Sequence, residues 1–363
     1  ECLPSNSGQW YRYRRLMNNL QLTPDEYTLL HEAFQGGFTH ACARFSHKTI
    51  KDVASYDFTS SYPAVMVLEQ FPMSIGYKVD NICEEEFKYR LDYFCCLFRV
   101  TFYNIDEKVT ADHPISASRC LRIKDDILDN GRVVSASELT LTVTDVDFKI
   151  IQDFYDYDNY TVSDFYYYYR GYLPTPFIRA VLGLYKDKTE LKGVHGQEIY
   201  YDKAKALLNS LYGMMAQDPV KRNLLFQQCG DWEEDLSISD EEILERSNKK
   251  AFLAYQWGVW VTAYARRNLF TGIIEFKDDY IYSDTDSIKV VNAENHKKYI
   301  EEYNRKITEK IARCLKHYKI PLGMATPKTI KGIPKPMGVW DYEGRYSRFK
   351  TLGAKRYMTE ENG

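Results

Sequence analysis

The sequence predicts an α+β fold in which strands and helices occupy separate stretches of the chain. Residues 91–150 contain strand patterns rich in aromatic and β-branched side chains, whereas residues 171–217 follow the spacing of helices. Residues 279–291 form two short apolar runs around an Asp-Thr-Asp turn, which is typical of a β-hairpin. The length of 363 residues, with no internal repeat, allows two or three subdomains.

The first 32 residues are expected to form a basic, aromatic stretch and then a helix. Residues 10–15 are WYRYRR, and Thr23 is placed to cap a helix that has Pro24 in its first turn. Gly36 and Gly37 then interrupt the chain.

A buried strand and an apolar helix are predicted next. The strand covers Val53–Phe58 and the helix covers Ala64–Phe71. Ser61 is the expected N-cap, and Pro63 lies where a first-turn proline is tolerated.

The β-rich stretch contains three strands and a following helix. We expect the strands at Tyr93–Tyr103, Leu121–Ile123 and Leu139–Val143, and the helix at Asp145–Tyr155. The tyrosine run at residues 166–169 favours packing in a strand or an interface over stacking on bases.

Two further helices are predicted downstream, at Trp257–Ile274 and at Lys297–Tyr318, the second of them amphipathic. Residues 231–245 hold eight acids and no base, which indicates a solvated loop or hairpin. Pro321–Pro336 is rich in Pro and Gly, which indicates a loop.

Bulk composition excludes several classes of protein. Hydrophobic residues make up 44% and charged residues 27%, as in ordinary soluble globular proteins. No run of about 18 apolar residues predicts a membrane span, and the first residues do not resemble a signal peptide. Eight cysteines without a CxxC pair indicate reduced thiols, and seven dispersed histidines give no sign of a metal site.

Charge is divided unevenly along the chain. The whole chain has a net charge of −3, but Lys297–Tyr357 carries 16 basic and 5 acidic residues, a net of +11. The rest therefore carries −3 − 11 = −14. This division suggests a polyanionic partner such as nucleic acid, contacted by one region of the chain.

Three aspartates are candidates for metal-dependent chemistry. Asp57 ends the buried strand, while Asp284 and Asp286 lie at the hairpin tip, where alternation can direct both to one side. Carboxylates directed at one point repel unless a cation neutralises them, and Mg²⁺ prefers such oxygen ligands. Two ions about 3.5–4 Å apart would hold the attacking and leaving oxygens of a phosphoryl transfer. The alternative is that the hairpin acids form an ordinary turn and Asp57 caps a helix.

One helix face carries groups that suit a nucleotide. Lys205, Asn209, Tyr212 and Gly213 are spaced i, i+4, i+7 and i+8, so they lie on one side. Lysine can bind phosphate, tyrosine can stack on a base or sugar, and glycine permits close approach. The alternative is a face directed at solvent.

Together these segments resemble the family B DNA polymerases. The first motif of that family is DxxSLYP, the second KxxxNSxYG, the third YxDTDS and the fourth KxY. The matching segments, in the family's order, are Asp57–Pro63, Lys205–Gly213, Tyr282–Ser287 and Lys355–Tyr357. Phe34–Gly37 is similar to the YxGG segment of the protein-primed, phage-type branch, and Trp257–Arg266 fits the helix before the third motif.

The resemblance implies a right-hand polymerase fold with an antiparallel palm sheet, helical fingers, two insertions and a truncated thumb. The implied divisions are an amino-terminal segment 1–32, a first palm segment 33–111, an insertion 112–170 for a priming protein, fingers 171–218, an insertion 219–253 for strand displacement, a second palm segment 254–327, and a primer-binding segment 328–363 leading to the thumb.

The family also implies roles for single residues. Asp57 and Asp286 would be the catalytic metal ligands, with the Phe58 carbonyl as a further ligand and Asp284 as a supporting catalytic carboxylate. The cofactor would be two Mg²⁺ ions, with Mn²⁺ as a substitute. The nucleotide-binding residues would be Tyr62, which excludes a 2′-hydroxyl, with Lys192, Lys205, Asn209 and Tyr212. The DNA-binding residues would be Gly36, Gly37, Ser60, Lys355 and Tyr357.

The resemblance implies template-directed DNA synthesis as the activity. The partners would be primer-template DNA, deoxynucleoside triphosphates and a terminal priming protein, with no membrane, in the cytoplasm of a phage host. One alternative is a non-catalytic replication module that binds DNA or a priming protein. Another is a different palm-type enzyme, such as a reverse transcriptase or a nucleotidyl cyclase, although these lack KxxxNSxYG.

The chain departs from the family pattern in several places. Ser61 replaces a leucine of the first motif, and Phe34 replaces the tyrosine of YxGG. We expect residues 1–363 to include neither an exonuclease segment before the first motif nor a complete thumb, and whether an exonuclease segment precedes Glu1 stays open. The acidic run 231–245 is easier to explain as an outer surface or a protein contact than as a surface that faces DNA.

Overall fold

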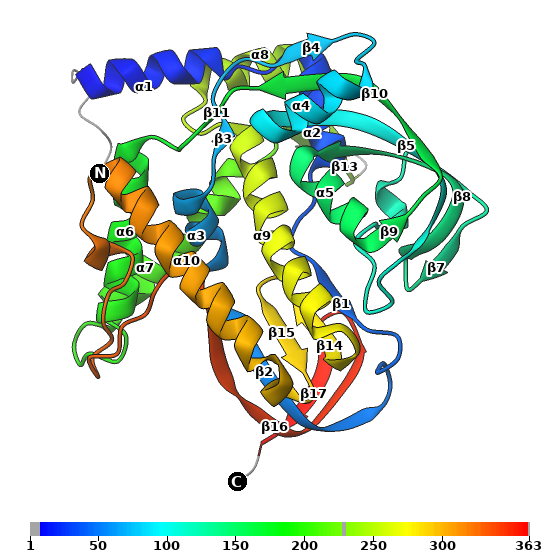
Figure 1. Cartoon of the computed structure of the whole chain (residues 1–363). Coiled ribbons are helices and arrows are strands. Elements are labelled where there is room, and N and C mark those ends of the chain that lie inside the picture. The colour runs from blue at the N-terminus through cyan, green and yellow to red at the C-terminus, as the bar shows by residue number, and fades with distance from the viewer. Residues whose placement is uncertain (1–7, 227–229, 362–363) are drawn as a thin grey trace.

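Two antiparallel sheets are arranged around the long helix α9 (Tyr255–Phe276), as Figure 1 shows. The computed structural model describes residues 8–226 and 230–361. One sheet lies at the C-terminal end of α9 and the other lies beside it (Figure 1). The predicted α+β class is confirmed.

The first sheet has six strands in the order β1-β14-β15-β2-β16-β17, all antiparallel. Their bounds are β1 Thr39–Ala41, β2 Thr49–Phe58, β14 Tyr280–Asp284, β15 Ser287–Val290, β16 Trp340–Gly353 and β17 Arg356–Glu360. The hairpin β14–β15 is therefore placed between the short edge strand β1 and the long strand β2. The predicted hairpin and the strand ending at Phe58 are confirmed.

The second sheet has the order β4-β10-β5-β8-β6, and β7 and β9 pair with β8 and β5. Its strands are β4 Tyr77–Val79, β5 Cys95–Glu107, β6 Arg122–Lys124, β7 Ile127–Asp129, β8 Arg132–Thr144, β9 Tyr155–Asp156 and β10 Asn159–Tyr168. Three tyrosines of the run 166–169 are in β10, and the burial of Tyr166 and Tyr168 confirms packing for these two, whereas Tyr169 follows the strand and is exposed. Two small pairs complete the strands, β3 Phe71–Pro72 with β11 Arg170–Gly171 and β12 Leu224–Phe226 with β13 Trp232–Glu234.

Most helices lie where the sequence patterns predict them. The helices Gly8–Asn19, Glu84–Tyr93 and Asp240–Lys250 were not predicted, and the helix predicted to end at Phe71 ends at Leu68. Their bounds are α1 Gly8–Asn19, α2 Pro24–Ala33, α3 Ser61–Leu68, α4 Glu84–Tyr93, α5 Asp145–Phe154, α6 Thr175–Glu190, α7 Glu198–Met215, α8 Asp240–Lys250 and α10 Lys297–Tyr318. Short 3₁₀ turns lie at Ala117–Arg119, Lys277–Asp279, Ala293–His296 and Leu322–Met324. The amphipathic helix α10 has the predicted bounds, and Thr23 caps α2 in a capping box with Glu26.

Three local predictions need correction. The N-cap of α3 is Ser60 and not Ser61, because Ser60 takes the left-handed φ of 55° and the helix begins one residue earlier than that cap would allow. The acidic run 231–245 contains the hairpin strand β13, but it also contains the first half of helix α8, which Ser239 caps. Strands β16 and β17 were not predicted.

Helix α9 is the centre of the core, and it packs against α3, α5 and α7. Seventeen of its 22 residues are buried, including Trp257 and Trp260. A helix that is apolar on nearly every side must lie inside a fold. The indole N–H groups of these two tryptophans donate to the Pro72 carbonyl at 2.9 Å and to the Asp145 carboxylate at 3.0 Å.

Helices cover one face of the six-stranded sheet. Ala54, Tyr56 and Phe58 of β2 belong to the main core. Strand residues alternate between faces, so Val53, Ser55 and Asp57 point to the other side, where the apolar cluster is small. This second face is consequently available for a site.

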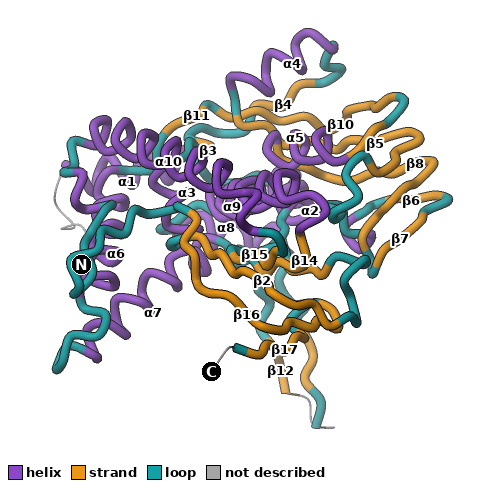
Figure 2. The backbone as a smooth tube through the Cα atoms, turned by 60° about the horizontal axis from the view of Figure 1, so that its bottom comes forward, coloured by secondary structure: helices purple, strands orange, loops and turns teal. Residues whose placement is uncertain are grey.

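The stretch between α7 and α9 leaves the body as a hairpin. Strands β12 and β13 project outward in Figure 2, and Leu224, Phe226 and Trp232 are largely exposed. Six cysteines in the described residues are free thiols, while Cys2 and Cys229 lie outside them. Over those same residues, no helix is long and apolar enough to cross a membrane.

Gly258 makes the close approach of α9 to α7 possible. A Cβ at Gly258 would lie 2.8 Å from backbone atoms of Met215 and Ala216, which cannot move independently of α7. Gly258→Ala is expected to destabilise the protein by about 1–3 kcal/mol through overpacking. Chemical denaturation would measure the free energy of unfolding.

Gly183→Ala in α6 is the matched control. A Cβ there meets no atom within 4 Å, so the same substitution should stabilise by about 0.5–1 kcal/mol through helix propensity. Equal effects of the two substitutions would contradict the packing argument.

Candidate functional site

Asp57 lies on the uncovered face of the six-stranded sheet, near the end of β2. Its backbone is paired with Ser287 of β15 on one side and with Asp341 of β16 on the other. Asp57 is therefore held by two neighbouring strands and not by a flexible loop.

Asp286 is brought to Asp57 by the hairpin turn. Thr285 takes a left-handed φ of 59°, and the Asp286 carbonyl accepts a hydrogen bond from the Phe58 N–H at 2.9 Å. The simple alternation predicted for Asp284 and Asp286 does not continue through this turn. Asp284 instead accepts hydrogen bonds from the hydroxyls of Thr39 at 2.7 Å and Thr285 at 3.1 Å.

The charges of these acids oppose one another. Burial, followed by the negative charges of Asp286 and Glu343, raises the pKa of Asp57 to about 8. Burial and then Asp284 raise the pKa of Asp286 to about 6. The fold thus brings together carboxylates that resist ionisation, which is the expected behaviour of a site that a cation completes.

The donor set fits a hard divalent cation. Within residues 8–226 and 230–361, no three His, Cys, Asp or Glu side chains are grouped so that they could enclose an ion. The set formed by Asp57 and Asp286 offers two carboxylates. Mg²⁺ is commonly held by one or two carboxylates, with waters and substrate phosphates as its other ligands.

Lysines of α6 and α7 face the acids. The Lys188 ammonium donates to the Ser60 hydroxyl at 3.0 Å. Burial, followed by the charge of Lys205, lowers the Lys188 pKa, while Asp57 opposes that shift and Lys192 adds to it. Lys188, Lys192 and Lys205 therefore form one group of cations beside the carboxylates. The sequence indicates Lys188 only as one of the cations upstream of Lys205, together with Lys186 and Lys192, and gives it no individual role.

Two aromatic rings lie between α3 and α7. The Tyr62 and Tyr212 rings stack with their centroids 4.2 Å apart. Asn209 and Gly213 are exposed on the same side of α7, and nothing lies within 4 Å of the position a Gly213 Cβ would take. The predicted face of α7 is thus open, whereas Ala204, Leu208 and Met215 pack inside.

The diglycine segment packs against the acidic turn. A Cβ on Gly37 would lie 2.6 Å from the Thr285 side chain, so only glycine permits this contact. The guanidinium of Arg266 in α9 donates to the carbonyls of Gln35 and Gly36, and it pairs with Asp147 at 2.7 Å. Arg266 and Asp147 are buried and were not predicted from the sequence.

Lys355 and Tyr357 are placed beside β14 by the hairpin β16–β17. The Lys355 N–H donates to the Tyr282 hydroxyl at 3.0 Å, and the Tyr357 ring lies 5.2 Å from that of Tyr282. Lys355 has a left-handed φ of 58° at the hairpin turn. Both residues are exposed, so the pair is available to a partner along the uncovered face.

A polar strip continues from the acids along the same face. The Ser55 hydroxyl donates to Glu343 at 2.9 Å, and the Lys289 ammonium reaches Ser55 at 2.6 Å. Burial lowers the pKa of Lys289, and nearby acids including Glu343 and Asp57 oppose that shift. Sequence reasoning missed Glu343 because strand β16 was not predicted. It missed Lys289 because this residue lies in an apolar strand, and its partners Ser55 and Glu343 belong to other strands.

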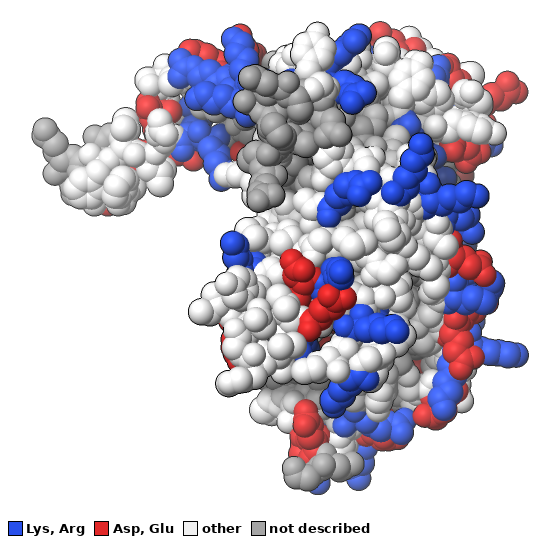
Figure 3. Space-filling model, turned by 90° about the vertical axis from the view of Figure 1, so that its left-hand side faces the viewer, with Lys and Arg blue, Asp and Glu red and all other residues white. Residues whose placement is uncertain are grey.

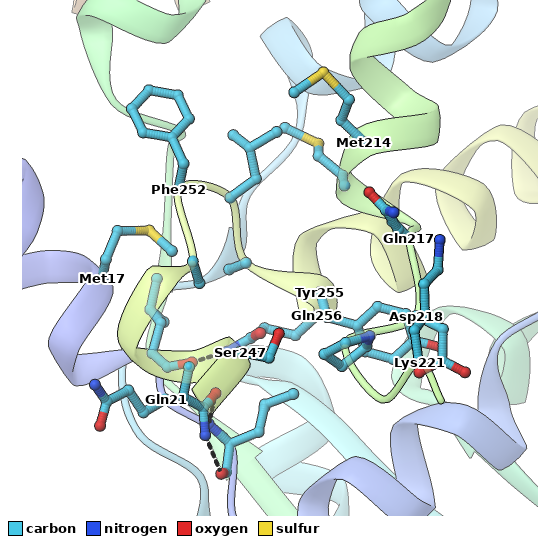
Figure 4. Close-up of a pocket in the computed structure, with 18 residues that line it drawn as sticks. Met17, Gln21, Met214, Gln217, Asp218, Lys221, Ser247, Phe252, Tyr255 and Gln256 are labelled. Atoms are coloured by element: carbon cyan, nitrogen blue, oxygen red, sulfur yellow. Dashed lines mark hydrogen bonds between the residues drawn. The ribbon is translucent and has the colours of Figure 1, made fainter. Parts of the chain in front are cut away.

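In the view of Figure 3 most of the surface belongs to uncharged residues, basic side chains are more prominent than acidic ones near the centre, and both signs alternate along the right-hand edge. A separate cavity of about 360 Å³ lies where α1, α7, α8 and α9 meet (Figure 4). Gln256 in its wall donates to the Leu20 carbonyl at 3.0 Å. The cavity contains none of the three candidate aspartates.

Comparison with known proteins shows the family to which this chain is related. The model of the family described as DNA polymerase type B, organellar and viral, matches residues 3–305. The DNA polymerase of Bacillus phage Nf is 24% identical over 355 residues, which is 96% of this chain and 52% of the relative. The DNA polymerase of Bacillus phage phi29 is 25% identical over 340 residues, 90% of this chain and 48% of the relative.

Solved structures show the same fold. Phi29 DNA polymerase complexed with primer-template DNA and incoming nucleotide substrates superposes with a TM-score of 0.65 at 21% identity, covering 94% of this chain and 53% of that one. The same polymerase complexed with single-stranded DNA gives 0.67 at 19% identity, covering 99% and 55%. This chain spans about half the length of these relatives.

The repulsion at the acidic turn predicts a pH-dependent stability. The raised pKa of Asp57 means that the folded protein binds this proton more tightly than the unfolded chain does. Stability from this group is complete below the unfolded value of about 4 and is lost as the pH rises through about 8. In EDTA at pH 8, Asp57→Asn should therefore stabilise the protein, by about 2 kcal/mol after allowing for solvent screening.

Thermal unfolding at pH 5 and pH 8 would test this, because the gain should shrink at the lower pH. Asp126→Asn, at an exposed position in the loop between β6 and β7, is the matched control and should change stability little at either pH. A loss of stability in Asp57→Asn at pH 8 would contradict the argument.

Proposed function

The chain belongs to the type B DNA polymerases of the organellar and viral group, and we propose that it catalyses template-directed addition of deoxynucleotides to a primer 3′-hydroxyl. The observation that carries the proposal is the pairing of Asp57 with Asp286 opposite the lysines of α6 and α7. Carboxylates that bind cations and lysines that bind phosphate are the two charge types that nucleotidyl transfer requires.

The residues that would hold the cofactor are Asp57, Asp286 and the Phe58 carbonyl, with two Mg²⁺ ions or Mn²⁺ in their place. When bound, these ions supply charge neutralisation on the triphosphate and activation of the primer hydroxyl. Asp284 would act as a supporting carboxylate, held by Thr39 and Thr285.

The chain's own residues would bind and orient the nucleotide. Lys205, with Lys192 and Lys188, would neutralise the triphosphate. Tyr62 and Tyr212 would lie against the sugar and base, since their rings stack beside the acids, and Asn209 would reach the nascent base pair from the exposed side of α7. Positioning of this kind accounts for most of the rate in phosphoryl transfer.

DNA would lie along the uncovered face of the six-stranded sheet. Lys355 and Tyr357 would hold the primer end, and Gly36, Gly37 and Ser60 would contact the backbone of template or primer. The basic stretch Lys297–Tyr357 supplies positive charge for phosphates, so binding should weaken as salt concentration rises.

The same proposal divides the chain into palm, fingers and two insertions, with the bounds that the family resemblance implies. Residues 112–170 would meet a terminal priming protein, and residues 219–253 would lie along the template. The projecting hairpin β12–β13 supports the second assignment, because it extends beyond the body. The protein would act in the cytoplasm of a phage host.

A non-catalytic module that binds DNA or a priming protein is the alternative function. The paired carboxylates count against it, since a pure binder gains nothing from acids that destabilise the fold. A reverse transcriptase or nucleotidyl cyclase would share the carboxylates but not the α7 motif. Primer extension on DNA and RNA templates, with deoxy- and ribonucleotides, distinguishes a DNA polymerase from each of these alternatives.

Asp286→Asn should abolish Mg²⁺-dependent primer extension, because one of the two charges that hold the cation is removed. Binding of primer-template DNA, measured by fluorescence anisotropy, should persist within about threefold, since the lysines remain. Near-normal extension by this variant would refute the assignment.

Tyr62→Ala should lower the preference for deoxy- over ribonucleotides by about tenfold or more, because the ring that would face the sugar is lost. Single-nucleotide incorporation with each nucleotide measures the ratio of kcat/KM values. Tyr103→Ala, at an exposed position on β5 of the other sheet, is the control and should leave the ratio unchanged.

A further inference from the structure

The short edge strand β1 contacts the strand that leads into the acidic turn through both its backbone and its side chains. Its backbone ladder pairs Thr39 with Asp284, His40 with Ser283 and Ala41 with Tyr282. Just before it, the Phe38 carbonyl accepts from the Thr285 N–H at 2.7 Å. The end of β14 that leads into the turn is therefore aligned against this short strand.

Thr39 adds a side-chain contact to that ladder. Its hydroxyl donates to the Asp284 carboxylate at 2.7 Å across a sequence separation of 245 residues. A hydrogen bond to a charged group is short and directional, so it fixes the rotamer of the carboxylate. Asp284 is two residues from Asp286, and the position of one constrains the other through the tight turn.

A three-residue edge strand is weakly held by its backbone hydrogen bonds alone. A buried polar cluster on its inner side adds further contacts. His40 Nδ1 lies 2.8 Å from Asp112 Oδ1, and both side chains are almost fully buried. The Tyr280 hydroxyl donates to Asp112 Oδ2 at 2.8 Å and lies 2.9 Å from the Ser283 hydroxyl. Asp112 thus connects β1 and β14.

Asp112 belongs to neither strand. It lies in the loop between β5 and the 3₁₀ turn Ala117–Arg119, which connects to the second sheet, and its carboxylate also accepts from the His113 N–H at 2.7 Å. Burying a carboxylate is costly unless its oxygens are satisfied, and this one has partners on both oxygens. The His40 ring lies against this carboxylate as a close ion-pair neighbour and not as a hydrogen-bond donor, since neither ring nitrogen makes a hydrogen bond. A hydrogen-bonded buried carboxylate of this kind favours one arrangement of the elements that it joins.

We propose that Thr39 and Asp112 are positioning residues of the acidic site: Thr39 fixes the Asp284 carboxylate, and Asp112 fixes the edge strand that carries Thr39. Asp112, the first residue of the stretch 112–170, then helps to align the hairpin β14–β15 that carries the acids. This role rests on the proposed function, because that function makes the acids catalytic. The contacts of Thr39 and Asp112 are observed independently of it.

The test compares Thr39→Val, which keeps the shape and removes the hydroxyl, with Thr39→Ser, which keeps the hydroxyl. Thr39→Val should lower the kcat of primer extension about tenfold, with KM for nucleotide and Kd for primer-template unchanged within about twofold. Thr39→Ser should recover most of the lost rate. Thr161→Val, at an exposed position in β10, is the matched control and should behave as the unaltered protein does.

A second readout does not depend on catalysis. Mn²⁺ alone should raise the thermal midpoint of the unaltered protein by binding the folded state. Thr39→Val should require about tenfold more Mn²⁺ for half of that rise, with an unchanged midpoint in EDTA. If no form of the protein extends a primer, the proposed function fails while this titration still tests the positioning role.

Asp112→Asn and Tyr280→Phe test the buried anchor, the second being the milder change. Both should lower kcat, as Thr39→Val does. The double variant Thr39→Val/Asp112→Asn should lose little more activity than the more damaging of its two single variants, because both changes act through β1. Wild-type rate and Mn²⁺ dependence in Thr39→Val would overturn the role of Thr39. Losses that multiply in the double variant would overturn the role of Asp112.

Discussion

The repulsion between Asp57 and Asp286 is the constraint on which the other features of the site depend. The two carboxylates are brought together from strands far apart in sequence, and burial makes their charges more costly. The fold holds them by a ladder on both sides of β2, a hydrogen bond from the Phe58 N–H to the Asp286 carbonyl, and a turn with a left-handed Thr285. Each of these contacts is made by backbone, which cannot relax by a change of rotamer.

The surrounding elements serve the same constraint in different ways. Helix α9 supplies a rigid core, and its Arg266 reaches the diglycine segment that packs against the turn. Position 37 requires glycine because Thr285 occupies the space that a Cβ would need. Helices α6 and α7 bring lysines toward the acids, which lowers the cost of the negative charge, while burial and the nearby charge of Lys205 make the charged form of Lys188 more costly. The fold therefore holds the acids and the lysines as two neighbouring groups of opposite charge.

Patterns of neighbouring residues predicted several helices and caps, but they did not predict contacts between segments that are far apart in the sequence. The amphipathic spacing of Lys297–Tyr318 and the cap at Thr23 depend on neighbouring residues, so the bounds of α10 and the start of α2 were correct. Strand β16 was missed because Trp340–Gly353 mixes charged, aromatic and glycine residues and its alternation breaks at the bulge between Tyr342 and Gly344. Pairing with β2 stabilises this strand. The aspartates were found by motif, whereas Thr39, Asp112 and Glu343 reach the site through contacts that no spacing encodes.

Two groups of opposite charge lie side by side at the site, both outside the basic helix α10. A net charge of −3 would give little attraction to a polyanion if it were spread evenly. The acids at the turn instead attract cations, while the lysines of α6 and α7 lie beside them and attract phosphate. Under the proposed function, a triphosphate with its cation would satisfy both sets at once, because the carboxylates would hold the metal and the lysines would hold the phosphates. A free cation or a free phosphate would balance only one set, so the arrangement would favour the complex of the two.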